Sequence, residues 1–374
     1  MNHSEINFTC PVIYYHSVGP VNKNWRRNYL TIEPEIFEQH LKYLSSKYSI
    51  ITLKDLWLIR KGRKAPVKNP LIINFDDGYL DNFIWAFPVL KKYNVKATIF
   101  ISPEFADQRE IVRSGDRETG FLSWDEMKIM EESGLIDIQS HTMSHTKYFV
   151  SGKIIDFHNP NSDFLYPVGN IHPSEKPYYI GNKNFEKLVP YGFPFFEEAS
   201  AVIARKVEIN PDFIQLCVNI LKDFDFEHYN FNEAFRIIKP YYYEYLTKGT
   251  LIIKRETEEE YKKRVHYEIF ESKRIIEGKL NKKVEFLCWP HGDNNEYLHQ
   301  LALQAGYLMT TTGKSKGVKI SDITRIPERT GIDFSTRCRK RKTIFKLKAF
   351  SGMFPNSVIF KSFRFFRSNI FIKQ

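Results

Sequence analysis

The sequence predicts an α/β protein in which parallel strands are covered by helices. Patterns typical of strands and of helices alternate over residues 1–148, and such alternation indicates a parallel sheet whose strands are joined by helices. In addition, polar residues directly follow two of the expected strands, at 76–78 and at 140–145. Because functional groups in α/β folds gather beyond the carboxyl ends of the strands, these two segments are the first candidates for a site.

The expected elements follow from local patterns taken in chain order. Short apolar runs such as Leu-Ile-Ile at 71–73 indicate buried strands. The helix over 123–133 has the clearest limits, because Ser123 with Glu126 three residues later is a capping-box pattern and Gly134 can end the helix. We expect strands at 11–15, 71–75, 97–102, 135–138 and 284–287, and helices at 34–46, 81–93, 123–133 and 256–280.

The first candidate motif is Asn-Phe-Asp-Asp-Gly at 74–78, at the end of a buried strand. On its own, Asp-Asp-Gly is most often a turn. Adjacent side chains on a strand point to opposite faces, but a turn at Gly78 removes that restriction. One of the two carboxylates, Asp76 and Asp77, can then bind a metal ion while the other stays free.

The second candidate motif is His-Thr-Met-Ser-His at 141–145. Its spacing resembles the helical zinc pair, yet the strand before it indicates a loop, and such a pair alone is often two surface histidines. Two imidazoles and one carboxylate are a common ligand set for Zn²⁺ and related ions. A divalent ion lowers the pKa of a coordinated water to near neutrality, and a second carboxylate can accept the proton. The two motifs together therefore predict a hydrolytic metal site.

At these residues the chain resembles the polysaccharide deacetylase family, also called the NodB-homology or carbohydrate esterase 4 group. The flanking segments 79–82 and 96–100 are similar as well, and Tyr-Tyr-His-Ser at 14–17 resembles the Tyr-His segment of relatives that deacetylate poly-N-acetylglucosamine. In that family the first Asp of the motif is the catalytic base, and the second binds the metal with both histidines. The resemblance therefore implies that Asp76 is the base and that Asp77, His141 and His145 are the ligands.

A third motif and two departures from the family pattern concern the rest of the site. Trp-Pro-His-Gly at 289–292 stands where the family has Pro-Tyr-Gly, so Pro290 and His291 take that place, and the backbone N–H of His291 can bind the oxyanion. Many relatives have an Arg just before this motif to orient the base, where this chain has Cys288; Arg325 or Arg329 is the candidate substitute. The usual late Leu-x-His, which supplies the general acid, has no clear counterpart. His291 and His16 are the candidates for the acid.

The resemblance narrows the fold to a distorted (β/α) barrel of the NodB type, usually described as seven-stranded. The second and third motifs lie about 145 residues apart, and an unstructured loop of that length is not expected in a compact domain. We therefore expect an insertion subdomain over the site, whose many aromatic residues either stack on sugar rings or pack in a core. The expected division is 1–146 for the first part of the barrel, 147–255 for the insertion, 256–333 for the completion of the barrel and 334–374 for a basic, aromatic tail.

The resemblance implies a metal-dependent N-deacetylase, a hydrolase of non-peptide carbon–nitrogen bonds. Its expected substrate is an N-acetylated sugar in a polysaccharide or glycolipid of the cell envelope. Zn²⁺ is the default ion, although the ligand set also accepts Co²⁺, Ni²⁺ or Fe²⁺. Two alternatives stay open: a glycan-binding protein of the same fold without turnover, suggested by the missing Arg and acid, and a hydrolase of a non-glycan amide.

Charge is concentrated at the end of the chain. Of 55 Lys and Arg residues, 11 lie in 334–374 together with no acidic residue, so the remaining 44 basic residues balance the 44 acidic residues. The body therefore gives no support for nucleic-acid binding. The four cysteines show no paired spacing, which argues against a disulfide framework. We find no secretory signal and no long apolar run, and we expect a cytoplasmic protein that contacts the inner face of an anionic membrane through its tail.

Deletion of residues 334–374 tests the predicted membrane contact. Each basic residue near an anionic surface contributes about 1 kcal/mol of attraction, so the truncated protein should lose most of its binding to vesicles that contain phosphatidylserine. Co-sedimentation of the full and truncated chains with anionic and with neutral vesicles measures this. Equal binding of both chains to anionic vesicles would contradict the prediction.

Overall fold

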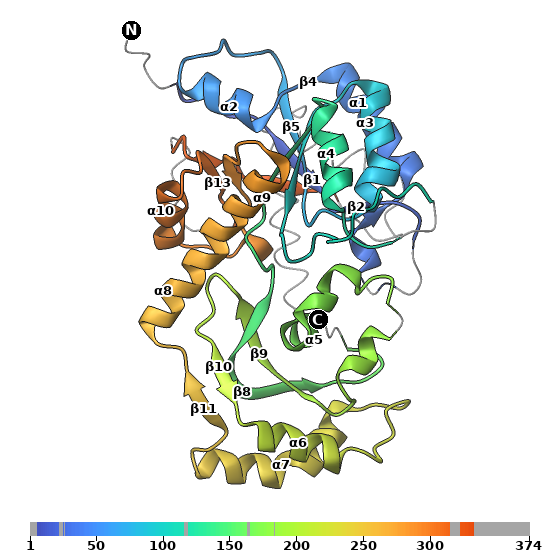
Figure 1. Cartoon of the computed structure of the whole chain (residues 1–374), viewed down its shortest axis with the longest axis vertical. Helices are drawn as coiled ribbons and strands as arrows, with labels where there is room; N and C mark the ends of the chain where they lie inside the picture. Colours follow the sequence, from blue (N-terminus) through green and yellow to red (C-terminus); the bar gives the residue numbers. More distant parts are fainter. Residues whose placement is uncertain are drawn as a thin grey trace, which may run out of the picture.

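The centre of the protein is a parallel sheet curled into a nearly closed barrel, as the sequence predicts. A computed structural model describes residues 6–21, 25, 27–115, 119–162, 165–182, 184–314 and 322–332. The short strand β4 (Ser49–Ile50) pairs with β5 outside the main path. Neighbouring strands around the barrel (Figure 1) are β14 (Arg325–Ile326), β13 (Met309–Thr311), β12 (Phe286–Leu287), β7 (Ile136–Ser140), β6 (Ala97–Ile101), β5 (Pro70–Phe75), β1 (Val12–Tyr15) and β15 (Arg329–Gly331).

One chain segment closes most of the barrel by pairing on both sides. Through β14 it pairs with β13, and through β15 it pairs with β1. Residues 327 and 328 separate the two short strands, and Pro327 has no N–H to continue a ladder. The family resemblance implies seven strands, and the path here has eight because its last strand is divided in two.

The two faces of the barrel strands bury different apolar clusters. Successive side chains along a strand point to opposite faces of the sheet. The side chains on one face come from strands all around the barrel and contact one another, so they fill the barrel interior. This inner set includes Val12, Ile72, Phe100, Phe286 and Ile326. The alternate set packs outward beneath the surrounding helices. That outer set includes Ile13, Ile73, Ile99, Ile138 and Leu287.

The helices expected between the first strands are present. The segment over 81–93 is a π-helical turn, η2 (Asn82–Ala86), that continues into α3 (Phe87–Tyr93). Ser123 and Glu126 form the expected capping box, since each side chain accepts a hydrogen bond from the other residue's N–H. The other helices around the barrel are α1 (Pro34–Lys47), α2 (Leu53–Arg60), α4 (Trp124–Glu132) and α10 (Glu296–Gln304).

The remaining short elements of the barrel part lie close to its carboxyl end. β2 (Ser17–Val18) pairs in parallel with β3 (Thr31–Ile32). A single turn of 3₁₀ helix, η1 (Asn28–Leu30), leads into β3. Another such turn, η6 (Pro290–Gly292), follows β12 and contains the third motif.

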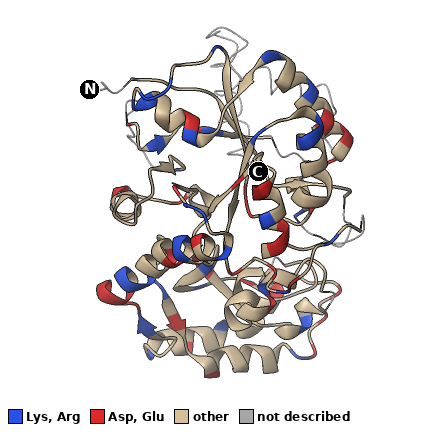
Figure 2. Ribbon diagram, turned by 45° about the horizontal axis from the view of Figure 1, so that its top comes forward, with Lys and Arg blue, Asp and Glu red and all other residues tan. Residues whose placement is uncertain are grey.

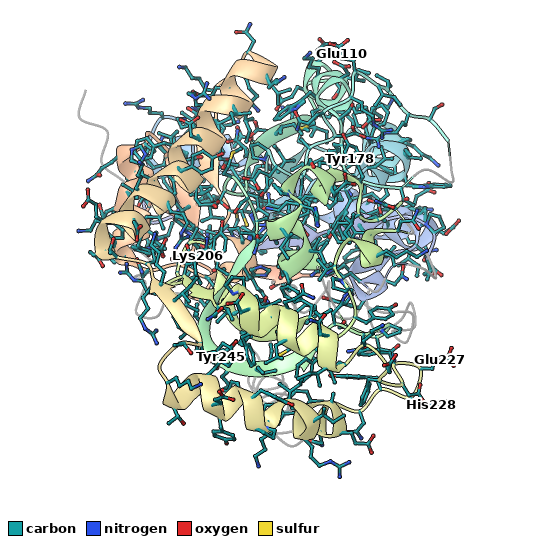
Figure 3. The ribbon with its side chains drawn as sticks, turned by 60° about the horizontal axis from the view of Figure 1, so that its bottom comes forward. Glu110, Tyr178, Lys206, Glu227, His228 and Tyr245 are labelled. Carbon is teal, nitrogen blue, oxygen red and sulfur yellow. The ribbon has the colours of Figure 1, made fainter. Side chains whose placement is uncertain are left out.

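Residues 147–255 form two antiparallel strand pairs with helices and their own apolar cluster. Phe157, Phe196 and Phe213 are fully buried in that cluster. Figure 1 places these elements at one end of the molecule, and Tyr245 of α7 points back toward α6 (Figure 3), 5.1 Å from the ring of Phe213. The elements are β8 (Lys147–Phe157) with β9 (Pro194–Ser200), β10 (Val207–Ile209) with β11 (Ile252–Arg255), α5 (Leu165–Ile171), η3 (Pro173–Tyr178), η4 (Phe185–Leu188), α6 (Pro211–Ile220) and α7 (Phe231–Thr247).

A helical rod returns the chain from the insertion to the barrel (Figure 1). The helix expected over 256–280 is divided by a π-helical turn at its middle. Its parts are α8 (Glu258–His266), η5 (Tyr267–Glu271) and α9 (Ser272–Leu280).

Several predictions from composition concern cysteines, membrane spans and the distribution of charge. Cys10, Cys217 and Cys288 are free thiols. Among the described residues, no helix is both long enough and apolar enough to cross a membrane. Basic and acidic residues are interspersed over the described ribbon (Figure 2). The basic tail at 334–374 lies outside the described residues.

Asp81 gives the fold a testable dependence on pH. Its carboxylate accepts hydrogen bonds from Ser17 Oγ at 2.5 Å and from Asn82 Nδ2 at 2.9 Å. Burial raises the pKa of Asp81 to about 6, although these hydrogen bonds oppose the shift. Between pH 4 and 6 the folded protein therefore holds a proton that the unfolded chain has lost. The contribution of Asp81 to the free energy of unfolding falls as the pH rises through this interval.

Replacement of Asp81 by Asn should remove this contribution. The difference in free energy of unfolding between Asp81→Asn and the unchanged protein should move in favour of the variant from pH 4 to pH 7, by up to about 3 kcal/mol. Urea unfolding at several pH values measures this difference. A difference that does not depend on pH would show that the pKa of Asp81 is not raised.

Candidate active site

A cavity at the carboxyl end of the barrel collects the residues that the motifs single out. Its volume is about 340 Å³, within the range of ordinary small-ligand sites. Asp76 and Asp77 follow β5, His141 and His145 follow β7, and His291 follows β12. The rest of its wall is Tyr14, His16, Arg27, Tyr29, Leu30, Tyr166, Trp289, Gly292, Gly313, Glu328 and Arg329.

The turn after β5 brings both aspartates to the same cavity. Asp76 lies four residues after Ile72 and therefore on the same face of the strand, which is the face toward the barrel interior. Asp77 would point the other way on a regular strand, but its φ is 72° and that of Gly78 is 70°. A Cβ on Gly78 would lie 2.6 Å from Ile101 Cγ2, so the turn requires glycine there. The left-handed conformation therefore begins at Asp77 itself, one residue before the expected position.

Asp77, His141 and His145 are arranged as the ligands of a single ion would be. Asp77 Oδ1 lies 3.3 Å from His141 Nε2 and 3.2 Å from His145 Nε2, and two ligands about 2.1 Å from a tetrahedral ion are about 3.4 Å apart. This buried Oδ1 has no hydrogen-bond partner among the described residues. The donor set and the unpartnered oxygen both fit a divalent metal ion.

The second nitrogen of His141 is also held. His141 Nδ1 lies 2.8 Å from the carbonyl oxygen of Cys288, so it is Nδ1 that carries the proton and Nε2 that presents its lone pair to the cavity. Burial raises the pKa of Asp77, but the adjacent His145 and His141 outweigh it and hold that pKa well below its ordinary value. The carboxylate is therefore available as an anionic ligand.

Asp76 forms a two-pronged ion pair with Arg329 at the base of the cavity. Arg329 Nη1 and Nη2 donate to Asp76 Oδ1 and Oδ2 at 2.7 and 2.8 Å. The guanidinium lies over the ring of Tyr14, 4.4 Å from its centroid, and 2.9 Å from Cys288 Sγ. Burial raises the pKa of Asp76, but the charge and hydrogen bonds of Arg329 lower it further, so the net pKa lies below its ordinary value. Asp76 is thus an ionised, oriented carboxylate beside the three metal-ligand candidates.

Two residues expected to bind the substrate or oxyanion do not line the cavity. Arg325 instead donates to Asn294 Oδ1 at 3.0 Å and to Glu296 Oε2 at 3.1 Å, and Arg329 takes the place for which both arginines were candidates. Pro290 is buried, and its neighbours Trp289 and His291 form the wall. The expectation for Arg325 and Pro290 must be revised accordingly.

The two candidates for the general acid differ in their surroundings. His16 follows β1 and lines the cavity. His291 lies beside His145, with ring centroids 4.8 Å apart, and its Nε2 is buried without a hydrogen-bond partner in the described chain. Burial and the neighbouring His145 lower the pKa of His291 to about 2. Its ring is therefore neutral at physiological pH. Other histidines lie elsewhere, such as His228 at the far end of the insertion (Figure 3).

The insertion contributes Tyr166 to the wall, which no motif in the sequence indicates. Its ring lies 6.3 Å from that of His145, nearly parallel to it, and 5.6 Å from that of His291. Arg27 lies over the same ring and donates to the Tyr166 hydroxyl at 3.3 Å. Of the two arrangements expected for the aromatic residues of the insertion, Phe193, Phe195 and Phe196 adopt core packing, since all three are buried.

Sequence comparison finds similarity to polysaccharide deacetylases. Residues 63–163 match the family model for polysaccharide deacetylases. The matched segment contains both the Asp76-Asp77 and the His141–His145 motifs, and it indicates the polysaccharide deacetylase family. It is 33% identical over 174 residues to the putative polysaccharide deacetylase YxkH of Bacillus subtilis (strain 168), an alignment that covers 42% of this chain and 56% of YxkH. It is also 28% identical over 213 residues to the poly-beta-1,6-N-acetyl-D-glucosamine N-deacetylase of Staphylococcus aureus (strain MSSA476), which covers 52% of this chain and 69% of that protein. The chain thus spans little more than half the length of YxkH.

Solved structures of deacetylases have the same fold. A de-N-acetylase from Aggregatibacter actinomycetemcomitans superposes with a TM-score of 0.54 at 18% identity, over 91% of this chain and 98% of that one. The deacetylase domain of BpsB from Bordetella bronchiseptica superposes with a TM-score of 0.51 at 17% identity, over 87% of this chain and 96% of that one. The polysaccharide deacetylase barrel predicted from the motifs is therefore confirmed at the level of fold.

Replacement of Arg329 by Gln should change both the titration of Asp76 and the stability of the barrel. Without the guanidinium, burial is opposed only by the weaker effects of His141 and His16, so the pKa of Asp76 should rise. A buried carboxylate without a partner should lower the free energy of unfolding by about 3–5 kcal/mol at neutral pH, and by less at low pH, where Asp76 becomes protonated. Thermal unfolding and ¹³C NMR titration of labelled aspartates measure these effects.

Arg325→Gln is the matched control. Arg325 is also buried, but its partner Glu296 is 70% exposed, so its loss should leave the titration of Asp76 unchanged. Equal effects of the two substitutions on the pKa of Asp76 would show that Arg329 does not hold that carboxylate.

Proposed function

We propose that this protein is a metal-dependent N-deacetylase that hydrolyses the acetamide of an N-acetylated amino sugar in a polysaccharide or glycolipid. The observation that carries the proposal is the juxtaposition of an ionised Asp76, paired with Arg329, and a three-residue ligand set in a single cavity. The names of the relatives, a putative polysaccharide deacetylase and a poly-beta-1,6-N-acetyl-D-glucosamine N-deacetylase, support this substrate class.

Asp77, His141 and His145 are the residues that would hold the ion. When bound, a divalent ion supplies Lewis acidity that polarises the amide carbonyl and activates water. Zn²⁺ is the default for two imidazoles and a carboxylate, and Co²⁺, Ni²⁺ or Fe²⁺ suit the same donors. The fixed proton on His141 Nδ1 keeps its Nε2 ready for this role.

Asp76 acts as the general base in this proposal. It accepts a proton from the water whose oxygen adds to the acetamide carbonyl carbon. Arg329 keeps the carboxylate ionised and fixes its orientation through two hydrogen bonds. Since the same pairing lowers the pKa of Asp76, the base stays unprotonated well into the acidic range.

The remaining roles fall to His291 and His16. The backbone N–H of His291, in a turn where its φ is 57°, is the proposed donor to the oxyanion. When the carbon–nitrogen bond breaks, the sugar nitrogen needs a proton. With a pKa of about 2, the His291 ring is not an imidazolium at physiological pH and is therefore a poor proton donor. We therefore assign the general acid to His16, and the products are acetate and a free amino sugar.

One of the two reasons for the alternative of an inactive binding protein, besides the missing acid, is the Cys288 found in place of the usual arginine. Arg329 reaches the same carboxylate from β15 and lies 2.9 Å from the Cys288 sulfur. The guanidinium is thus supplied from another strand, which favours turnover over binding alone. Because the tail carries 11 basic and no acidic residues, we also propose that the enzyme works at the inner face of a membrane on lipid-linked sugars.

Acetate release tests the proposed activity. Purified protein with added Zn²⁺ or Co²⁺ should release acetate from N-acetylglucosamine oligosaccharides or from a lipid-linked N-acetyl sugar. Asp76→Asn should reduce the rate by about 10²–10⁴-fold, the usual contribution of a general base, and His16→Ala should reduce it by a similar factor. His299→Ala is a control, because His299 lies outside the cavity and its two ring nitrogens contact Thr310 and Thr324.

Other outcomes of this assay separate the alternatives. Bound metal without acetate release from any acetylated glycan would favour the binding protein. Preferential hydrolysis of a small cyclic amide would favour the non-glycan hydrolase. Release by Asp76→Asn at the rate of the unchanged protein would overturn the role of Asp76.

A further inference from the structure

A buried glutamate from the returning helical rod holds the loop that carries both histidine ligands. Glu268 is 1% exposed, and its side chain lies against the loop of residues 141–146. Glu268 Oε2 accepts hydrogen bonds from Met143 N at 3.1 Å and from Ser144 N at 3.0 Å, and Oε1 accepts from Ser144 Oγ at 2.5 Å. Three donors from two successive residues of the loop therefore converge on one carboxylate, and none of the proposed catalytic roles uses it.

The backbone at Glu268 is shaped for the same contact. Glu268 lies in the π-helical turn η5 between α8 and α9, and such wider turns occur frequently at functional sites. Its carbonyl oxygen also accepts from Met143 N, at 3.0 Å. Both the main chain and the side chain of this residue thus face the loop.

The loop needs such support because its backbone is strained. Thr142 and His145 have φ values of 62° and 41°, a conformation that non-glycine residues keep only where their surroundings impose it. The carbonyl oxygens of Met143 and Ser144 accept from Glu104 N at 3.2 Å and from the buried Lys176 Nζ at 3.4 Å. Glu268 satisfies the N–H groups of the same two residues, which would otherwise be buried without partners.

We propose that Glu268 is a positioning residue for the metal site: by fixing the loop between His141 and His145 it sets the separation of their Nε2 atoms and hence the affinity for the ion. This inference rests on the proposed function, since it assumes that these histidines bind a metal. Glu268 belongs to the helical rod that returns from the insertion (Figure 1), 123 residues after His145 in the sequence. A segment far away in the chain therefore holds the loop that carries the ligands.

Glu268→Gln is the variant that tests the proposal. Gln can still accept from Met143 N and Ser144 N through its single carbonyl oxygen, so the protein should fold, but the third acceptor is replaced by a donor. Loss of an outer partner of a metal ligand typically weakens binding about 10–100-fold, and we expect a loss in this range. Titration of the metal-free full chain with Co²⁺ or Zn²⁺ against a chelator measures the affinity. The visible spectrum of the Co²⁺ form reports the ligand geometry, and it should change as well.

Two further variants make the result decisive. Glu271→Gln removes the same charge from the same turn, but Glu271 pairs with Arg274 at 2.7 Å and not with the loop. The metal affinity of this variant should therefore stay within about twofold of that of the unchanged protein, well short of the loss expected for Glu268→Gln. Ser144→Ala removes only the hydroxyl donor, and should weaken binding by a smaller factor; it decides the question if Glu268→Gln does not fold.

The outcomes for metal binding and for stability are separable. A lower melting temperature with unchanged metal affinity and an unchanged Co²⁺ spectrum would reduce Glu268 to a purely structural residue and overturn the proposal. Failure of the unchanged protein to bind any divalent ion would instead overturn the proposed metal-dependent function, and the positioning role with it. Weaker binding by Glu268→Gln but not by Glu271→Gln supports the proposal even if no glycan substrate has been found.

Discussion

The ion pair between Asp76 and Arg329 joins the closure of the barrel to the assembly of the site. Asp76 follows β5, Arg329 begins β15, and β1 lies between these strands. Both charges are largely removed from water, and such a pair is stable only when its geometry is good and its remaining hydrogen-bonding groups are satisfied. Two parallel hydrogen bonds meet that condition. The carboxylate of Asp76, the proposed base, is therefore oriented only when the last strand has docked beside the first.

Several left-handed backbone conformations lie in the turns that carry the candidate site residues. Asp77, Thr142, His145 and His291 all have positive φ values, and each lies in a turn that follows a barrel strand. Regular strands would send adjacent side chains to opposite faces, whereas these turns bring several of them into one cavity. Such conformations cost free energy and persist only where the surroundings hold them. Here the holding groups include Ile101, which packs against Gly78, and Glu268 beneath the ligand loop.

The local parts of the fold and site were accessible from the sequence, because they depend on neighbouring residues. The capping box at Ser123, the strand before Asp76 and the loop position of His141 and His145 follow from patterns a few residues long. Which arginine reaches Asp76 could not be derived in this way. Ile326 faces the barrel interior, and regular alternation would turn residue 329 outward.

The irregularity at Pro327 and Glu328 reverses that alternation. Arg329 is opposite Val12, whose side chain faces the barrel interior, so the arginine also points into the barrel. Arg325 is opposite Thr310 and points away from the interior. A one-residue shift in the alternation of inward and outward side chains, between the two parts of a divided strand, is difficult to detect in the sequence. Glu268 and Tyr166 are hidden for a different reason, since they meet the site only through tertiary packing of segments far away in the chain.

The insertion follows directly after the loop that carries His141 and His145, and its contacts restrict local unfolding of that loop. Three residues after Ser144, the chain enters β8, and Thr146 accepts a hydrogen bond from Ala201 N, just beyond β9, at 2.8 Å. Lys176 of the insertion contacts the carbonyl of Ser144, and Tyr166 packs beside His145. Local opening of a structure follows its weakest packed units, and here the loop cannot open without loosening both the insertion and the returning rod. An insertion that surrounds this loop stabilises the positions of the proposed metal ligands as well as forming part of the cavity wall.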